Sequence, residues 1–359
     1  MTIRKRLAFA GAAIILAIGA AFSVLLCADL YLHRRAERLA GVNIWGYRGP
    51  RIPGKRTGEH RLVVLGGSAV FGYGVNWTDA FPAQLEADLR PLLMVQAPLS
   101  VVNLGYNSQG AYSFRFTLDD YQSLDYDAAI LCEGYNDLGD APNEYVGRRE
   151  SPVFRLTGYY PVLHIALQEK AMALRNGGDI DAAYRGKTVF KPGLAARTTA
   201  GALDAAAVVT RSLNAELDRF SQVPAAAVTY ADVHVEDVGC APRWAHYCAS
   251  VHDAVRFVLD HRKKVLIVTQ PYVSDAHRQQ QRELRSMLRA RFGSNPDVGY
   301  ADLGDAMKLP DPHLAYDGMH MTVAGNSIMA SRLVAPIVAL MPGVFDAPHQ
   351  PTGTGDRAE

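Results

Sequence analysis

The sequence carries no excess of charge of either sign. Its 37 basic residues are balanced by 36 acidic ones, which gives a formal net charge of +1 over 359 residues. A nucleic-acid-binding protein normally presents a basic face, and no run of Lys and Arg interleaved with aromatic residues occurs here. We therefore expect no nucleic-acid partner.

Cysteines and groups of metal-binding side chains are also scarce. Four cysteines are too few for a disulfide framework, although Cys240 and Cys248 are close enough to pair in an oxidising compartment. No His, Cys and Asp grouping has metal-ligand spacing, so we predict neither a metal nor a cofactor. His246, His252 and His261 lie in a charged helical stretch and are expected to be solvated.

Only one long uncharged apolar run stands out, at the N-terminus. Arg4, Lys5 and Arg6 precede the run from Leu7 to about Ala28. About twenty apolar residues are enough for a helix to cross a bilayer. The run predicts an uncleaved anchor in the cytoplasmic membrane over residues 7–28, within a terminal segment 1–30.

Three other interpretations of this segment remain open. A cleaved signal peptide is disfavoured because the run lacks a small-x-small cleavage site. A lipoprotein cysteine at Cys27 is disfavoured by bulky Leu26 before it. A buried core helix is the third alternative.

Basic residues flank both ends of the apolar run, so the positive-inside rule gives only a weak indication of its orientation. We expect a cytoplasmic N-terminus and an exported periplasmic or extracellular catalytic domain.

After a linker over 31–60, short apolar runs alternate with helical patterns, which is typical of a parallel sheet covered by helices. The predicted strands are Arg61–Gly66, Ser100–Leu104, Ala128–Cys132, Lys264–Thr269 and Val298–Ala301. The predicted helices are Phe81–Leu93, Ala111–Tyr121, Ala276–Arg291 and Val323–Leu340. A composition that is 49% hydrophobic and 20% charged suits such a buried core.

The alternation of predicted strands and helices is interrupted between residues 138 and 235. Amphipathic stretches at Val162–Leu174 and Leu203–Phe220 predict a helical insertion or lid within a domain spanning 61–345. The polar tail 346–359 is expected to be disordered.

Ser68 directly follows the first predicted strand, in Gly66-Gly67-Ser68. A side chain at the carboxyl end of a parallel strand lies at the edge where α/β proteins bind ligands. Taken alone the tripeptide is a weak signal, because Gly-Gly-Ser is more often part of an ordinary loop. A phosphate-binding loop is disfavoured because no Gly-Lys-Ser/Thr follows.

Polar and glycine residues follow the next two predicted strands. Gly105 comes after the second strand, and Asn136 after the third. Cleavage of an ester by a serine needs donors aimed at the developing oxyanion. The backbone N–H groups of Ser68 and Gly105 and the Asn136 amide are candidates; the alternative is that they are turn residues.

Asp317 stands three residues before His320, just ahead of the last predicted helix. A serine hydroxyl becomes a nucleophile when a base takes its proton, and a carboxylate fixes the tautomer of that base. The pair is therefore a candidate base and partner for Ser68, with a solvated Asp-Gly turn as the alternative.

Together these blocks resemble the SGNH (GDSL-type) serine hydrolase superfamily, in a bacterial membrane-anchored form. The matched blocks are Gly66-Gly67-Ser68, Gly105, Gly134-x-Asn136-Asp137 and Asp317-x-x-His320. The resemblance covers about 61–137 and 264–340, and the segment from Asn43 to Pro50 is similar to the lead-in of bacterial members.

The resemblance implies a flavodoxin-like three-layer α/β/α sandwich. It implies Ser68 as nucleophile, His320 as base and Asp317 as its partner, with Ser68, Gly105 and Asn136 forming the oxyanion hole. One departure is Gly67, which stands where the family usually has Asp.

The expected activity is hydrolysis of a carboxylic ester, either an O-acyl glycan or a lipid ester, through an acyl-Ser68 intermediate. Two alternatives remain open at this point. An O-acyltransferase of an envelope polysaccharide would use the same residues, and a non-catalytic binding protein would keep the fold with a degenerate triad. The sequence does not indicate the oligomeric state.

Overall fold

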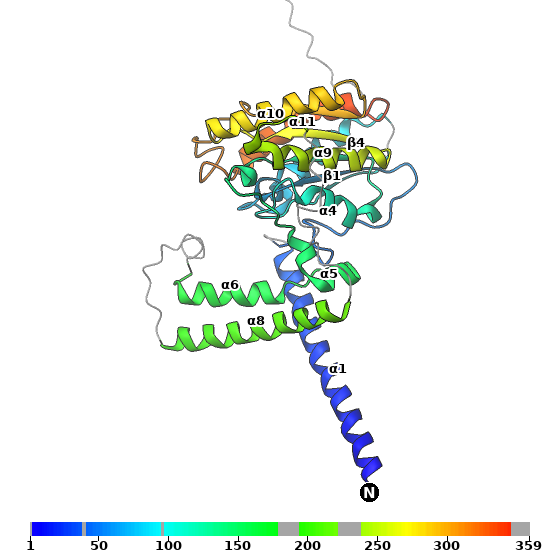
Figure 1. The fold of residues 1–359 in the computed structure, drawn as a ribbon, viewed down its shortest axis with the longest axis vertical. Coiled ribbons are helices and arrows are strands. Elements are labelled where there is room, and N and C mark those ends of the chain that lie inside the picture. The colour runs from blue at the N-terminus through cyan, green and yellow to red at the C-terminus, as the bar shows by residue number, and fades with distance from the viewer. Residues whose placement is uncertain (1, 38–40, 95–96, 179–193, 222–237, 346–359) are drawn as a thin grey trace, which may run out of the picture. The chain divides into compact units, whose positions relative to one another are not determined.

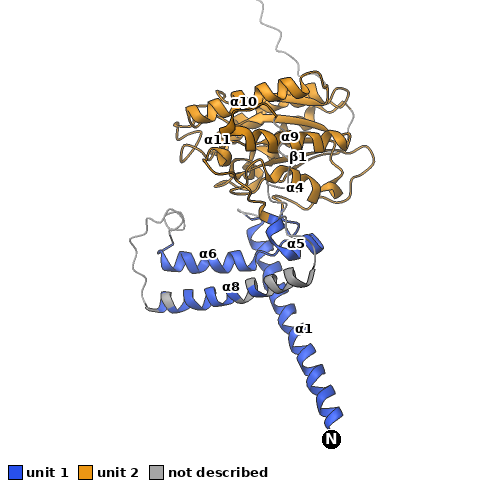
Figure 2. Ribbon diagram, in the orientation of Figure 1, with its two compact units in different colours: residues 1–46, 148–227 blue, residues 47–147, 228–359 orange. Residues whose placement is uncertain are grey.

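The computed structural model describes residues 2–37, 41–94, 97–178, 194–221 and 238–345 (Figure 1). The chain divides into two compact units, which Figure 2 colours separately. Unit 1 comprises Met1–Gly46 and Arg148–Ala227, and unit 2 comprises Tyr47–Gly147 and Val228–Glu359.

Unit 2 is built on a five-stranded parallel sheet with the order β2-β1-β3-β4-β5. The strands are β1 (His60–Gly66), β2 (Leu99–Asn103), β3 (Ala128–Cys132), β4 (Lys264–Thr269) and β5 (Val298–Asp302). All five residues of β3 are buried, as expected of a strand covered on both faces. The chain moves outward from β1 to β2 and then crosses to β3, so the order reverses between β1 and β3. In open α/β sheets, ligands bind at the carboxyl ends of the strands beside such a point.

Helices cover both faces of this sheet and complete three layers (Figure 1). On one face, α3 (Phe81–Leu89) packs against α11 (Val323–Leu340), and both enclose a core that includes Leu62 and Val64 of β1. Side chains alternate along a strand, so buried Val63 and Leu65 face the other layer. That layer contains α4 (Ser113–Asp120), α9 (Ala245–Asp260) and α10 (Asp275–Phe292).

The predicted α/β sandwich is confirmed, and the predicted elements differ from the observed ones mainly at their ends. Strands β3 and β4 and helix α11 have the predicted bounds. Helix α3 ends at Leu89 instead of Leu93, because Pro91 lacks the N–H that would continue the helical hydrogen bonds. The chain continues there as the 3-10 turn η2 (Arg90–Leu92).

Short helical turns connect the longer elements of unit 2. They are α2 (Ser68–Phe71), η1 (Trp77–Asp79), η3 (Gln122–Leu124), η4 (Tyr135–Asp137) and η6 (Pro242–Trp244).

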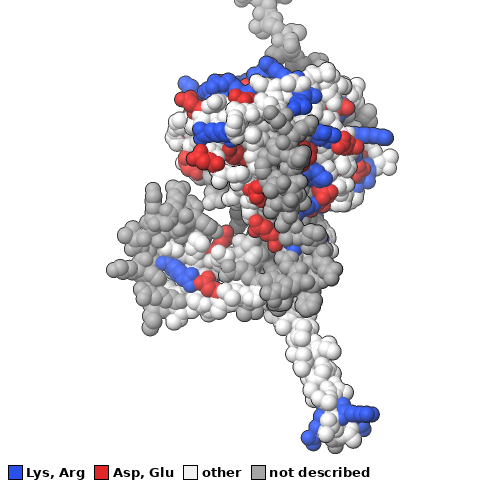
Figure 3. Space-filling view, in the orientation of Figure 1, with Lys and Arg blue, Asp and Glu red and all other residues white. Residues whose placement is uncertain are grey.

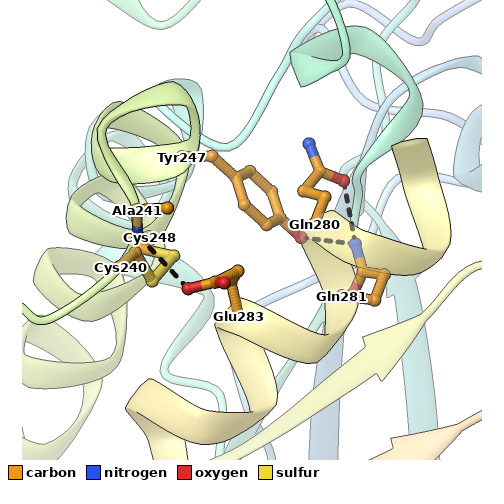
Figure 4. The surroundings of a disulfide bond; sticks show 7 residues. All are labelled: Cys240, Ala241, Tyr247, Cys248, Gln280, Gln281 and Glu283. Atoms are coloured by element: carbon orange, nitrogen blue, oxygen red, sulfur yellow. Dashed lines mark hydrogen bonds between the residues drawn. A yellow bond between two sulfur atoms is a disulfide. The ribbon is translucent and has the colours of Figure 1, made fainter.

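Cys240 and Cys248 form the disulfide that the sequence offered as a hypothesis. It ties the segment before α9 to the first turns of that helix (Figure 4). The backbone N–H of Ala241, beside it, donates to Glu283 Oε2 of α10 at 3.2 Å. The prediction that His252 is solvated is wrong: it is 9% exposed and lies against Phe292.

Unit 1 begins with the 34-residue helix α1 (Ile3–Ala36). Two helices among the described residues are long and apolar enough to cross a membrane, α1 and α11, but α11 belongs to the core of unit 2. The apolar window of α1 has a mean hydropathy of 2.4 and none of it is buried. Figure 3 shows its uncharged surface, with basic side chains at the N-terminal end. An apolar helix of this kind is compatible with a single-pass anchor.

The last turns of α1 are polar and are bonded to another part of unit 1. Asp29 Oδ1 accepts the backbone N–H groups of Val162 and Leu163 at 2.8 and 2.6 Å. The two ring nitrogens of His33 lie 3.0 Å from Val42 O and 2.9 Å from Tyr160 O. Asp29 and His33 are both buried. The C-terminal end of α1 is thereby fixed to the start of α6 (Leu163–Arg175).

The other named elements of unit 1 are all helical among its described residues. Its other elements are η5 (Gly147–Glu150), which begins at the boundary, α5 (Pro152–Thr157) and α8 (Leu194–Ser221). Helices α6 and α8 pack together and include, apart from Val162, the two amphipathic stretches that predicted helices. The expected disordered tail 346–359 lies outside the described residues.

Candidate active site

Ser68 is the first residue of α2, which begins directly after β1. The connection needs glycine: a Cβ at Gly66 would lie 2.2 Å from the backbone oxygen of Cys132, much closer than any real contact. At the other end, Gly72 adopts φ +77° and terminates the turn. The strand therefore presents Ser68 at the carboxyl edge of the sheet, next to the point where the strand order reverses.

Arg48 holds the far end of this turn. Its guanidinium donates to the carbonyl oxygens of Phe71 and Val75, and to Gly72 O at 2.6 Å. It also lies 4.3 Å from the centroid of the Phe71 ring. Burial lowers the pKa of Arg48 to about 10, so the group remains cationic at neutral pH. It donates to carbonyl groups at the end of α2 that have no partner within the helix.

His320 lies between Ser68 and Asp317. Its Nε2 is 2.8 Å from Ser68 Oγ, and its Nδ1 is 2.6 Å from Asp317 Oδ2. A carboxylate accepts a proton donor, so this contact selects the tautomer with hydrogen on Nδ1. Nε2 then carries the lone pair that can accept the Ser68 hydroxyl proton.

Asp317 is held in place by its own loop. Its Oδ1 accepts the backbone N–H groups of Met319 at 3.0 Å and His320 at 2.7 Å. Partial burial opposes ionisation of this carboxyl, but hydrogen bonds from the backbone and side chain of His320 outweigh it and lower the pKa of Asp317. The ionised form that orients His320 is thus the stable one at neutral pH.

Two tyrosines flank the His320 ring. The Tyr73 ring centroid is 4.8 Å away, and the Tyr316 ring is stacked at 5.9 Å with an interplanar angle of 19°. The Tyr316 hydroxyl donates to Tyr73 O at 3.0 Å, which connects the two rings. Both tyrosines are partly exposed, at 36% and 45%, so they form part of the surface around the site.

The two other predicted oxyanion donors are brought close to the Ser68 loop, and both have protein acceptors. Gly105 N–H donates to Asn103 Oδ1 at 3.0 Å, and a Cβ at Gly105 would lie 2.6 Å from Phe71 N of α2. Asn136 Nδ2 is 2.9 Å from Gln109 O and 3.4 Å from Glu133 Oε1. Their part in stabilising an oxyanion stays a prediction.

The sequence analysis assigned no role to a pair of acids that the structure buries near this loop. Glu133 and Asp137 are 2% and 8% exposed. Burial raises the pKa of Glu133 to about 7 and raises the pKa of Asp137 well above its ordinary value. The signal available in the sequence was a Glu placed directly after the uninterrupted apolar strand β3.

Among the described residues, no three His, Cys, Asp or Glu side chains are grouped closely enough to hold a metal ion. The polar groups around Ser68 are instead donors, acceptors and one imidazole. Such a set is suited to proton transfer and nucleophilic attack by a hydroxyl.

No protein-family model matches the chain, and no curated protein matches it. Similar solved structures include a putative lipolytic protein of the G-D-S-L family from Desulfitobacterium hafniense, at 12% identity and a TM-score of 0.38, covering 76% of this chain and 97% of that one. An acetylxylan esterase from Geobacillus stearothermophilus has 14% identity, a TM-score of 0.41 and coverages of 77% and 94%. An alpha/beta hydrolase from a Lake Arreo metagenome has 15% identity and a TM-score of 0.41, covering 79% of this chain and 96% of that one. Likeness at this distance does not assign an activity.

Proposed function

We propose that this protein is a membrane-anchored serine hydrolase of the SGNH (GDSL) type, which cleaves a carboxylic ester through an acyl-Ser68 intermediate. The observation that carries the proposal is the continuous hydrogen-bonded chain from Ser68 Oγ through His320 to Asp317. Ser68 and His320 are 252 residues apart in the sequence. A turn with a purely structural role would not require this order of donors and acceptors.

In the first half of the reaction, Ser68 Oγ attacks the ester carbonyl carbon while its proton passes to His320 Nε2. The carbonyl oxygen becomes an oxyanion, for which the N–H groups of Ser68 and Gly105 and the Asn136 amide are the proposed donors. The intermediate collapses, the C–O bond to the alcohol breaks, and the proton on His320 leaves with the alcohol.

In the second half, water attacks the acyl-Ser68 carbonyl as His320 takes one of its protons. Collapse breaks the bond to Ser68 Oγ, which regains the proton, and the acid is released. Asp317 stays ionised throughout and stabilises the imidazolium that forms twice in the cycle.

The proposed setting is outside the cytoplasmic membrane. The apolar helix α1 supports an anchor, and its basic N-terminal residues support a cytoplasmic N-terminus. The Cys240–Cys248 bond supports an oxidising compartment. An envelope ester, either an O-acyl glycan or a lipid ester, is the substrate class that this setting favours.

The nucleophile is tested by labelling the protein with a fluorophosphonate probe, which phosphonylates activated serines. The parent should label at Ser68 and Ser68→Ala should not. Ser331→Ala is the matched control, because Ser331 is exposed on α11 and hydrogen-bonds only locally, to Ile328 O. An unlabelled parent would contradict the proposed function, and equal labelling of Ser68→Ala would place the nucleophile elsewhere.

A further inference from the structure

Gly67 has no side chain, yet a carboxylate lies where one would extend from it. A Cβ built on Gly67 would be 2.6 Å from Glu133 Oε2 and 2.3 Å from Asn136 Nδ2. The resemblance to SGNH hydrolases leads one to expect Asp at this position. Here the space beside the Ser68 loop is occupied by an acid that comes from the end of the neighbouring strand β3 instead.

The Glu133 carboxylate joins the two loops that follow β1 and β3. Its Oε2 accepts the backbone N–H of Gly67. Its Oε1 accepts the backbone N–H groups of Gly134 at 2.9 Å and Asn136 at 3.2 Å, and lies 3.4 Å from the Asn136 side-chain nitrogen. One buried group therefore fixes the backbone next to Ser68 relative to both the backbone and the amide of Asn136.

The backbone of Glu133 is held as well. Its carbonyl oxygen accepts the Tyr247 hydroxyl at 2.9 Å, and that hydroxyl in turn accepts Gln281 Nε2 at 2.9 Å. Figure 4 shows Tyr247 and Gln281 directed toward each other from α9 and α10. Both helices thus support the backbone of Glu133 through these two hydrogen bonds.

We propose that Glu133 is a positioning residue of the active site, which sets the Asn136 amide and the Ser68 loop for oxyanion binding and takes the place of an acid at position 67. The inference rests on the proposed function, since it concerns the same site. Glu133 acts through Asn136 and Gly67, not through contact with the reacting atoms.

A stability role alone does not account for this acid. Burial raises the pKa of Glu133 to about 7, so the folded protein holds its proton more tightly than the unfolded chain does. Its contribution to the free energy of unfolding therefore decreases as pH rises from about 4.5 to about 7, where the charged form accumulates. Keeping a buried carboxylate charged thus lowers the free energy of unfolding. The loop geometry that is set by its N–H donors explains this acid better than a gain in stability does.

The test compares kcat and KM of Glu133→Gln with those of the parent on a p-nitrophenyl ester. In Gln one oxygen becomes an NH₂ group, which would face an N–H donor of Gly67 or Gly134 and release that loop. We expect kcat to fall about 10²-fold, as when an oxyanion donor is lost, with KM changed less than about twofold. The matched control is Glu59→Gln: Glu59 is also buried, but it pairs with Arg61 at the start of β1, so its loss should leave kcat unchanged.

A double-variant cycle separates positioning from an independent effect. Because Glu133 is proposed to act through both the Asn136 amide and the Gly67 N–H, Glu133→Gln should reduce kcat by a smaller factor in an Asn136→Ala background than in the parent. An equally large loss of kcat in both backgrounds would show that Glu133 does not act through Asn136 and would overturn the proposal.

The pH profile gives a second readout that a purely structural role would not alter. In the parent, protonation of Glu133 should add to the loss of activity below about pH 7. The plot of log(kcat/KM) against pH should therefore be less steep on its acid side in Glu133→Gln than in the parent, by a slope of up to about one. The ionisable groups around Glu133 that remain in the variant are Cys132, Tyr135, Asp137, Tyr247 and His277. An unchanged slope would contradict the assignment.

If Glu133→Gln fails to fold, Gly67→Ala provides the test instead. Its Cβ would displace the Glu133 carboxylate and the Asn136 amide, while both residues are kept. It should show the same loss in kcat, and a parental kcat would overturn the proposal. A parent that does not label at Ser68 would remove the proposed function and this inference together. A parent that labels, with Glu133→Gln labelling and turning over at the parental rate, would remove the inference alone.

Discussion

The imidazole of His320 uses its two nitrogens for two different tasks. Nδ1 is committed to Asp317 Oδ2, so Nε2 is left to face Ser68 Oγ. Because Asp317 is itself fixed by two backbone N–H groups of its own loop, the ring orientation depends on short-range contacts within four residues. A change in the loop before α11 would therefore alter the orientation of the ring.

Replacing His320 by Ala should abolish proton transfer while leaving the fold intact, because the ring is at the surface of the site. We expect kcat/KM to fall by about 10³-fold or more, measured on a p-nitrophenyl ester, with an unchanged melting temperature. A loss below about tenfold would be inconsistent with His320 as the base.

Tyr316 should contribute to catalysis by restricting the His320 ring. Tyr316→Ala removes the stacked ring and is expected to lower kcat about tenfold, since small losses of alignment are costly. Tyr316→Phe is the control: it keeps the ring and loses only the hydroxyl bonded to Tyr73 O, so its kcat should stay within about twofold of the parent. If both variants behave alike, the ring does not position the base.

The sequence located Ser68, Asp317 and His320 because each stands beside a recognisable strand or helix boundary, and the structure brings these three together. It did not reveal Glu133, whose side chain turns back along its own loop and meets Gly67 from another strand. Nor did it reveal that Gly105 packs against α2. Contacts of this kind depend on strand order and register, which hydrophobic periodicity does not encode.

Among the elements, the strands were the most predictable part of the fold. A short uninterrupted apolar run such as Ala128–Cys132 favours a strand that is buried on both faces, and β3 is buried along its whole length. Helix ends were less predictable where capping decides them; α10, for example, begins after Ser274, whose side chain accepts the His277 N–H. The burial of His252 depends on α9 packing against α10, which no local pattern indicates.

The disulfide at the start of α9 should be measurable without a structure. Alkylation of the unreduced, denatured protein should modify only Cys27 and Cys132, the two free cysteines, and reduction should expose two more. Modification of four thiols without reduction would contradict the bond.

Replacing both Cys240 and Cys248 by Ser should lower the free energy of unfolding by about 2–3 kcal/mol, because an eight-residue separation closes a short loop. Denaturant unfolding of parent and variant measures this difference. Tyr247, which supports Glu133, precedes Cys248 directly, so kcat of the variant should be followed as well.

At the scale of the whole molecule, α1 should determine where the protein is found. The full chain is expected in the membrane fraction, extractable by detergent and not by high salt or carbonate, because its apolar window has the length and hydropathy of a span. Protease added outside intact spheroplasts should degrade the catalytic domain. Recovery of the full chain in the soluble fraction would contradict an uncleaved anchor.

The polar end of α1 also bears on how a soluble version should be cut. Asp29 accepts the N–H groups of Val162 and Leu163 at the start of α6, so α1 provides the N-terminal cap of another helix in its own unit. A truncation at residue 37, the end of the helix, would remove that cap together with His33 and leave a buried site unfilled. The better boundary is before Asp29, and proteolytic shedding from the membrane would preserve unit 1 only if the cleavage occurred on the bilayer side of that residue.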